Sequence, residues 1–214
     1  MASNTPQNCT QCPRLVTFLQ QVKVAHPDYY CQPVLPFGAE RPRLFIVGLA
    51  PGMHGANATG RAFTGDYAGV LLYSTLYQFG FATRPESISA DDGLQLIHCR
   101  ISNAVKCLPP ANKPLPVEIK TCNVYLREEL QALPPTTAIL TLGSIAHQAT
   151  LMAFGMKPSA AKFKHAEVHR LPSGHTLFNS YHCSRYNTNT RRLTEQSFHD
   201  VFRLIQQHLS AQSL

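Results

Sequence analysis

No apolar run in the 214-residue chain reaches the roughly 18 residues that a membrane-spanning helix needs. The polar start MASNTPQNCTQC also lacks the basic and apolar regions of a signal peptide. The chain has no internal repeat and no low-complexity tract, so a repeat architecture is not expected. These absences predict a soluble, cytoplasmic protein with no membrane partner.

Acidic residues are scarce, with 12 Asp and Glu against 19 Lys and Arg, which gives a formal net charge of +7. A positive balance favours a polyanionic partner through counterion release, although many basic proteins never bind DNA. Hydrophobic residues make up 44% of the chain, enough to bury one substantial core at this length. We therefore predict a single domain over residues 1–214.

A disulfide framework is not expected, because seven cysteines are an odd number in a chain without an export signal. Four of them have surroundings or spacing that suit metal ligation: Cys9, Cys12, Cys107 and Cys122. Four thiolates can hold either a tetrahedral zinc ion or a 4Fe–4S cluster, and the residues alone do not separate the two. Four unrelated buried cysteines remain the alternative. A metal here would have a structural role, because it would join the N-terminal segment to a remote loop.

Four apolar runs are predicted as buried strands: residues 43–51, 98–107, 136–144 and 176–182. Helical patterns follow them at residues 68–80, 118–133 and 145–154, and in a final amphipathic stripe of Phe198, Val201, Phe202, Ile205 and Leu209. Residues 166–171 can pair with the last strand in a hairpin. Strands that alternate with helices predict a three-layer α/β/α fold around a four-stranded, mainly parallel sheet.

Polar residues gather where the predicted strands end, which is the edge at which an open α/β sheet binds ligands. The loop after the first strand contains His54, Asn57, Thr59, Arg61, Thr64 and Asp66. Asn103 ends the second strand, and residues 182–187 follow the fourth. We expect these strand ends to meet in one cleft.

The stretch GLAPGMHGANATGRAFTGD, residues 48–66, is rich in glycines that let the backbone approach a ligand closely. It is not a phosphate-binding P-loop, because no Gly-Lys-Ser/Thr follows. On composition alone, a structural glycine-rich turn is about as good an interpretation as a binding site.

These residues, together with NAVKC at 103–107 and SYHCSRYNTNTRRLT at 180–194, resemble the type b, or family 5, uracil-DNA glycosylases. The resemblance runs from Cys9 to about Thr194, with three separated motifs and the cysteine spacing in the same order. It implies a monofunctional DNA glycosylase that hydrolyses the N-glycosidic bond of uracil in DNA and initiates base excision repair. It further suggests action on other deaminated bases such as hypoxanthine, and a 4Fe–4S cluster on the four cysteines named above.

The resemblance also implies roles for individual residues. Asp66 would lie near the anomeric carbon, His182 would donate a hydrogen bond to a uracil carbonyl, and Asn103 would read the base. The base pocket would be formed by Gly48, Leu49, Ala50, Gly52, Met53, His54 and Phe63, with Phe63 stacked on the flipped base. Arg185 or Tyr186 would be inserted into the duplex. Ser184, Asn187 and Arg191 suit contacts with DNA phosphates, although solvated loop polarity accounts for each of them equally well.

Two departures from the wider pattern stand out. Related glycosylases carry a polar or acidic residue in the Gly-x-x-Pro segment, but Leu49 and Ala50 are apolar here. Cys183 replaces the proline that usually follows the second-motif histidine. From the residues alone, Asp66 is also a common helix cap or turn residue and Phe63 a common core residue.

The expected partner is double-stranded DNA that contains uracil or another deaminated base, bound by a monomer. Two rival hypotheses remain at this point. One is a catalytically idle protein that recognises damage without cleavage. The other is a redox or zinc-binding protein of the same shape, for which DNA is irrelevant.

Overall fold

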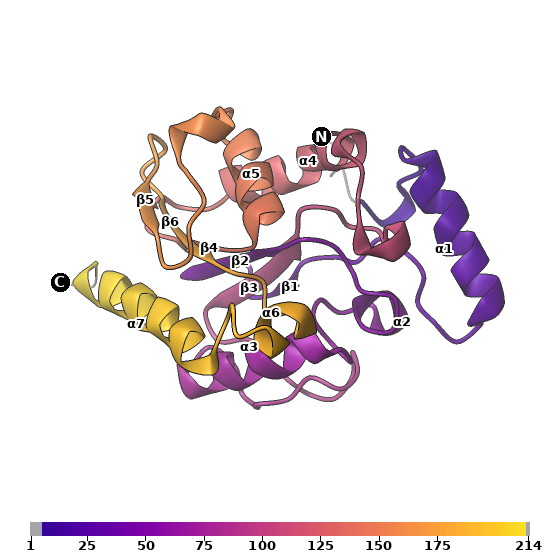
Figure 1. Ribbon diagram of the computed structural model, residues 1–214, viewed down its shortest axis with the longest axis horizontal. Helices are drawn as coiled ribbons and strands as arrows, with labels where there is room; N and C mark the ends of the chain where they lie inside the picture. Colours follow the sequence, from indigo (N-terminus) through magenta and orange to yellow (C-terminus); the bar gives the residue numbers. More distant parts are fainter. Residues whose placement is uncertain (1–5, 213–214) are drawn as a thin grey trace.

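The central sheet has the strand order β1-β3-β2-β4-β6-β5 in the computed structural model, which describes residues 6–212 (Figure 1). Four of these strands are parallel neighbours and correspond to the four predicted apolar runs: β2 (Leu44–Gly48), β3 (Cys99–Asn103), β4 (Ala138–Leu142) and β6 (Thr176–Ser180). The mixed α/β fold with a mainly parallel central sheet is therefore confirmed.

Within the described residues the sheet has six strands, two more than the four of the parallel core. At one edge, β1 (Phe37–Gly38) pairs antiparallel with β3, and at the other edge, β5 (Val168–Arg170) pairs antiparallel with β6. The second pair is the predicted hairpin. The first was not predicted, because a two-residue strand carries no periodic pattern.

One face of the sheet is covered by α3 (Tyr67–Gln78) and α7 (Glu195–Ala211), which lie below it in Figure 1. Every second strand residue points to this side, so Leu44, Ile46 and Leu140 join one buried cluster with these two helices. The predicted stripe of α7 is buried in the same cluster. The prediction of a final amphipathic helix is therefore confirmed.

The opposite face is covered by α4 (Pro116–Gln131) and α5 (Ser144–Ala153). Phe45, Val47 and Ile139 point to this side and pack with Leu126 and Leu130. Both helices correspond to predicted helical segments, and together the two clusters account for the three layers.

Three helices had no sequence prediction: α1 (Pro13–Ala25), α2 (Ala56–Thr59) and α6 (Arg185–Asn189). Single 3-10 turns also occur at Pro6–Asn8, Pro110–Asn112 and Pro158–Ala160. The helix α1 buries Leu15, Leu19 and Val22 against the segment after β3 and one side of α4, in a third cluster beside the sheet. None of the helices within residues 6–212 is long and apolar enough to cross a membrane.

Candidate functional site

A cavity of about 500 Å³ opens at the carboxyl edge of the parallel strands. Segments that are remote in the sequence border it, since Leu49 follows β2, Asn103 ends β3 and His182 follows β6. Its lining residues are Leu49, Ala50, Gly52, Met53, His54, Gly55, Ala56, Phe63, Asp66, Tyr67, Ala68, Asn103, Asn112, His182, Ser184 and Arg185. The strand ends therefore meet in one pocket, as the sequence predicts.

A second groove, of about 590 Å³, lies between the N-terminal turn and α1. No carboxylate and no histidine lines it. The first pocket therefore holds the better arrangement for chemistry, and we call it the strand-end pocket.

The back of the strand-end pocket is formed where Gly48, Phe63 and Asn103 meet. A methyl group at Gly48 would collide with Oδ1 of Asn103 and with the ring of Phe63, so glycine is required for this approach. Phe63 has a φ of 55°, a left-handed backbone conformation that is strained for an aromatic residue. Its ring is buried and faces His182, with ring centroids 5.8 Å apart.

Asn103 is a buried amide with an unused acceptor. Its Oδ1 has no hydrogen-bond partner within the described residues, although the side chain is only 3% exposed. A buried polar atom of this kind costs free energy unless a ligand or water completes it. The main chain of Asn103 is fixed by Lys106, whose Nζ donates to the Asn103 carbonyl at 2.9 Å and pairs with Glu129 at 2.7 Å.

Asp66 lies at the amino end of α3, as its N-cap. Its Oδ1 accepts a hydrogen bond from Gly69 N at 3.0 Å, while Oδ2 lies against Gly52 and Gly55, both of which line the pocket. Burial raises the pKa of this carboxyl, and hydrogen bonds from the Gly69 and Ala68 amides oppose that rise. The carboxylate is therefore partly desolvated but stabilised from one side by the helix end.

His182 lines the same pocket as Asp66. Burial lowers the pKa of His182 to about 4, so the ring is neutral near pH 7. A neutral imidazole carries one N–H donor and one acceptor. The residue is anchored through its backbone, because Asn187 Nδ2 donates to the His182 carbonyl at 2.8 Å.

The short helix α6 forms one rim of the pocket. Ser184 is its N-cap and accepts from Asn187 N at 3.5 Å. The Arg185 guanidinium lies over the Tyr67 ring, with Cζ 5.0 Å from the centroid, whereas Tyr186 is 71% exposed. Of the two residues predicted to insert into a duplex, Arg185 is therefore held against the protein and Tyr186 projects from it.

The remaining predicted DNA contacts lie outside the pocket lining. Tyr186 and Asn187 belong to α6, and Arg191 follows that helix as an exposed residue with a φ of 56°. Asn187 uses its amide to hold the His182 carbonyl. The Asn187 side chain therefore helps to hold the backbone of His182 at the pocket.

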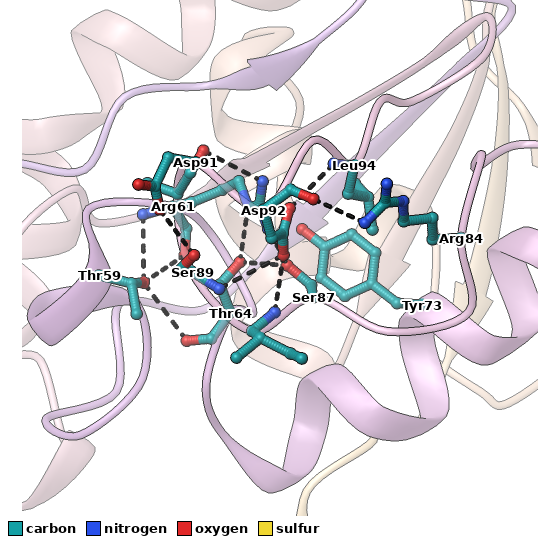
Figure 2. A network of polar contacts seen from close by, with 12 residues as sticks. Thr59, Arg61, Thr64, Tyr73, Arg84, Ser87, Ser89, Asp91, Asp92 and Leu94 are labelled. Carbon is teal, nitrogen blue, oxygen red and sulfur yellow. Dashed lines mark hydrogen bonds and ion pairs between the residues drawn. The ribbon is translucent and has the colours of Figure 1, made fainter.

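Four polar residues of the first loop do not line the pocket, contrary to the expectation that the polar side chains of this loop share the cleft: Asn57, Thr59, Arg61 and Thr64. Arg61 and Thr64 are buried behind it, in a network with the segment that follows α3 (Figure 2). The burial of Arg61 was not expected from the sequence, because a charged residue in a glycine-rich loop is usually exposed.

Conversely, Tyr67 and Asn112 line the pocket without having been predicted. Tyr67 begins α3 directly after Asp66, and its position next to a candidate carboxylate was the only available signal. Asn112 comes from the Pro-rich loop after β3 and has a φ of 55°. Nothing in its local sequence points to the site.

Cys9, Cys12, Cys107 and Cys122 border one narrow cavity between the N-terminal turn, α1 and α4. All four are free thiols. Burial, together with the neighbouring thiols, raises the pKa of Cys107 to about 12, and burial also raises the pKa of Cys122, to about 11. Beside the cavity, Arg14 ties α1 to α4 through two hydrogen bonds of 2.7 Å to the Glu118 carboxylate.

Among residues 6–212, no group of three or more His, Cys, Asp or Glu side chains is arranged to hold a metal ion. The four cysteines thus share a cavity without forming a compact single-ion site. Cys31, Cys99 and Cys183 are not among the residues that line this cavity.

Comparison with known proteins identifies the family of this chain. The family model described as the uracil DNA glycosylase superfamily matches residues 35–206, and the chain belongs to that superfamily. The chain is 42% identical over 198 residues to a type-5 uracil-DNA glycosylase of Thermus thermophilus, with 90% of each chain covered. It is also 42% identical over 200 residues to a type-5 uracil-DNA glycosylase of Pyrobaculum aerophilum, which covers 92% of this chain and 87% of the relative.

A type-4 uracil-DNA glycosylase of Archaeoglobus fulgidus is more distant, at 31% identity over 170 residues and 77% of each chain. The motif-based resemblance to the family 5 enzymes is thereby confirmed.

Proposed function

We propose that this protein hydrolyses the N-glycosidic bond of uracil in double-stranded DNA. The observation that carries the proposal is the strand-end pocket itself, which is lined by Asn103 with its unpartnered Oδ1, a neutral His182, the Asp66 carboxylate and the Phe63 ring. A pocket with these groups suits a planar base removed from the helical stack, and the positive net charge suits its polyanionic carrier. The names of the related proteins support the same substrate.

Base recognition would rest on Asn103 and Phe63. The edge of uracil presents a ring N–H beside a carbonyl oxygen, and a side-chain amide offers the complementary acceptor and donor. The unpartnered Oδ1 of Asn103 would accept that N–H. Stacking on the Phe63 ring contributes about 1–3 kcal/mol per base in comparable sites.

Bond cleavage would rest on Asp66 and His182. As the base departs, the sugar acquires oxocarbenium character and the base acquires negative charge. A carboxylate at Asp66 stabilises the first, and the N–H of a neutral His182 stabilises the second. Leu49 and Ala50 are apolar, so the chemistry does not draw on a carboxylate from that segment.

The DNA backbone would be held along the rim formed by α6. Tyr186 is free to enter the gap left by the flipped base, whereas Arg185 packs on Tyr67. The exposed Arg191 suits a phosphate.

Cys9, Cys12, Cys107 and Cys122 would hold a 4Fe–4S cluster, which supplies structural stability and no electron transfer. One observation supports this donor set. Four neighbouring thiols in a low-polarity cavity favour a group of several cations that neutralises their thiolates.

The deciding experiment measures release of free base from labelled duplex DNA with one uracil, using purified protein. Release with no strand cleavage is expected, because the mechanism is hydrolytic and monofunctional. Tight binding to the same duplex without release would instead indicate a damage-recognition protein.

The pocket should also accept hypoxanthine. Hypoxanthine presents the same N–H and carbonyl pair as uracil. The pocket lining between Gly52 and Ala56 contains the flexible Met53 and small residues rather than a bulky ring, so a larger base can fit. We expect fastest release of uracil opposite guanine, where the mispair flips at lower cost, and slower but measurable release of hypoxanthine. Single-lesion duplexes, compared with undamaged adenine as the control, test this. Hypoxanthine release no faster than adenine release would contradict it.

The neutral state of His182 predicts a pH dependence of stability. Its folded pKa of about 4 lies below the unfolded value of about 6.5, so the unfolded chain binds more protons between these values. The free energy of unfolding should therefore rise with pH across this window. His182→Gln, which keeps a donor but does not titrate, should flatten the rise in urea denaturation series.

Burial also lowers the pKa values of His165, His175 and His208, which add slopes of the same sign. These three histidines are present in both the wild type and the His182→Gln variant. The difference between the two urea denaturation series therefore isolates the contribution of His182. Parallel series would show that His182 titrates normally.

A further inference from the structure

The segment from Thr59 to Asp66 carries two groups of the strand-end pocket on a strained backbone. Phe63 has a φ of 55°, next to Gly60 at 80° and Gly65 at 79°. A bulky residue keeps such a conformation only where its surroundings fix the chain. Contacts from outside the segment are therefore needed to hold Phe63 and Asp66 in place.

Arg61 holds much of this segment, because it is only 4% exposed and its guanidinium lies within a network of polar contacts that includes Thr64, Ser87 and Asp92 (Figure 2). Its Nε donates to Thr64 Oγ1 at 3.0 Å, within the same segment. Its Nη2 donates to Ser87 Oγ and to Asp92 Oδ2, both at 2.6 Å. One buried cation therefore joins the pocket segment to residues 87–92.

Asp92 is fixed in turn by its own backbone surroundings. Its Oδ2 accepts from Ile88 N at 2.8 Å, and its Oδ1 accepts from Leu94 N at 2.9 Å. Burial alone would raise the pKa of Asp92, but the bonds from Arg61 and the backbone amides outweigh it and hold the pKa below the usual range. The ion pair is thus permanently charged, and loss of one partner leaves the other charge buried and unpaired.

Backbone contacts complete the link between the two segments. Gly65 N donates to the Ser87 carbonyl at 3.2 Å, and Ser87 Oγ also bonds Thr64 Oγ1 at 2.6 Å. From α3, the Tyr73 hydroxyl donates to the Ala62 carbonyl at 2.8 Å. The bonds to Ala62, Thr64 and Gly65 bracket Phe63 on both sides.

We propose that Asp92, acting through Arg61, is a positioning residue for the reaction proposed above, on which this inference rests. The pair sets the backbone of residues 61–66, so that the Phe63 ring and the Asp66 carboxylate are placed before DNA arrives. Neither Arg61 nor Asp92 lines the pocket. Their effect is therefore on the geometry of groups that touch the substrate, and small displacements of such groups are costly to the rate.

The test is Asp92→Asn, which keeps an acceptor oxygen but removes the charge that pairs with Arg61. Two quantities are measured on uracil-containing duplex: the single-turnover cleavage rate at saturating enzyme and the enzyme concentration for half-maximal rate. We expect the rate to fall about tenfold or more, with the half-saturating concentration within about twofold of wild type. A role limited to stability would lower the melting temperature without changing the rate of the folded protein.

Asp91→Asn is the matched control. Asp91 is the exposed neighbour of Asp92, and its Oδ1 accepts from Ser89 Oγ at 2.7 Å. Its replacement should leave both quantities unchanged. Ser87→Ala is the second test variant, because it removes one hydroxyl between Arg61 and Thr64 while the ion pair remains, and a rate decrease of about threefold is expected.

The outcomes separate this inference from the proposed function. Wild-type protein that releases no uracil would overturn both. Active wild type with Asp92→Asn and Ser87→Ala at undiminished rates would overturn the positioning role alone. If Asp92→Asn does not fold, Ser87→Ala decides, and a wild-type rate for that variant is then the contrary result.

Discussion

Asp66→Ala should lower the single-turnover rate of uracil release by about 100-fold or more while DNA affinity stays nearly unchanged. In the proposed mechanism the carboxylate interacts with positive charge that develops on the sugar only as the bond breaks, so its loss would raise the barrier without weakening ground-state binding. Rapid-quench measurement of base release, with a separate binding titration, gives the two quantities. A rate within threefold of wild type would show that Asp66 only caps the helix.

Because Asp66 is the N-cap of α3, the alanine variant alone mixes two effects. Loss of a cap costs about 0.5–2 kcal/mol of stability, whereas Asn is as good a cap as Asp. Asp66→Asn should therefore keep the melting temperature near wild type and still be as slow as the alanine variant. Thr194→Ala, which removes the N-cap of α7 far along the chain, is the matched control for lost capping and should retain the wild-type rate.

The raised pKa of Asp66 adds an independent signature. Burial disfavours the charged form, so the acid limb of the rate profile should lie above the ordinary aspartate pKa of about 3.9. The rate falls as the pH drops through that limb, because the protonated carboxyl no longer offsets positive charge on the sugar. His182, with its pKa of about 4, is mostly neutral above that pH.

The sheet could be predicted from the sequence because buried parallel strands leave a strong signal. The two central strands β2 and β4 are apolar on both faces, since one face packs on α3 and α7 and the other on α4 and α5. The strands β3 and β6 mix polar with apolar residues but are also largely buried. The final helix was equally clear, because its buried stripe faces an exposed polar side. The edge strand β1 and the helix α6 are too short for any periodic pattern to develop.

The pocket was predictable to the extent that its residues follow core strands. Asn103 and His182 stand directly at strand ends, and Phe63 and Asp66 belong to the glycine-rich stretch that follows β2. Asn112 was not predictable, because its place depends on a Pro-rich loop that folds back over the sheet edge. The burial of Arg61 and Lys106 was also hidden, since long-range partners such as Asp92 and Glu129 have no fixed spacing in the sequence.

Replacement of Cys107 or Cys122 by Ala should abolish the cluster and most of the soluble protein. The proposed 4Fe–4S group joins the N-terminal turn, the segment after β3 and α4, so its binding energy is part of the folding free energy. Wild-type protein should be brown, with broad absorption near roughly 400 nm and iron and acid-labile sulfide in equal amounts. A colourless preparation with stoichiometric zinc would contradict the iron assignment.

Cys31→Ala is the control that separates ligation from the mere loss of a cysteine. Cys31 also packs against the third cluster, yet it does not line the cavity that the four candidate ligands share, and its Sγ accepts a bond from Asn57 at 3.5 Å. This variant should stay soluble and brown. The Arg14–Glu118 ion pair ties α1 to α4 without any metal, so the soluble remainder of each ligand variant should be partly folded. Such a product should be colourless and less stable to urea than Cys31→Ala, and a brown, equally stable Cys122→Ala would remove Cys122 from the ligand set.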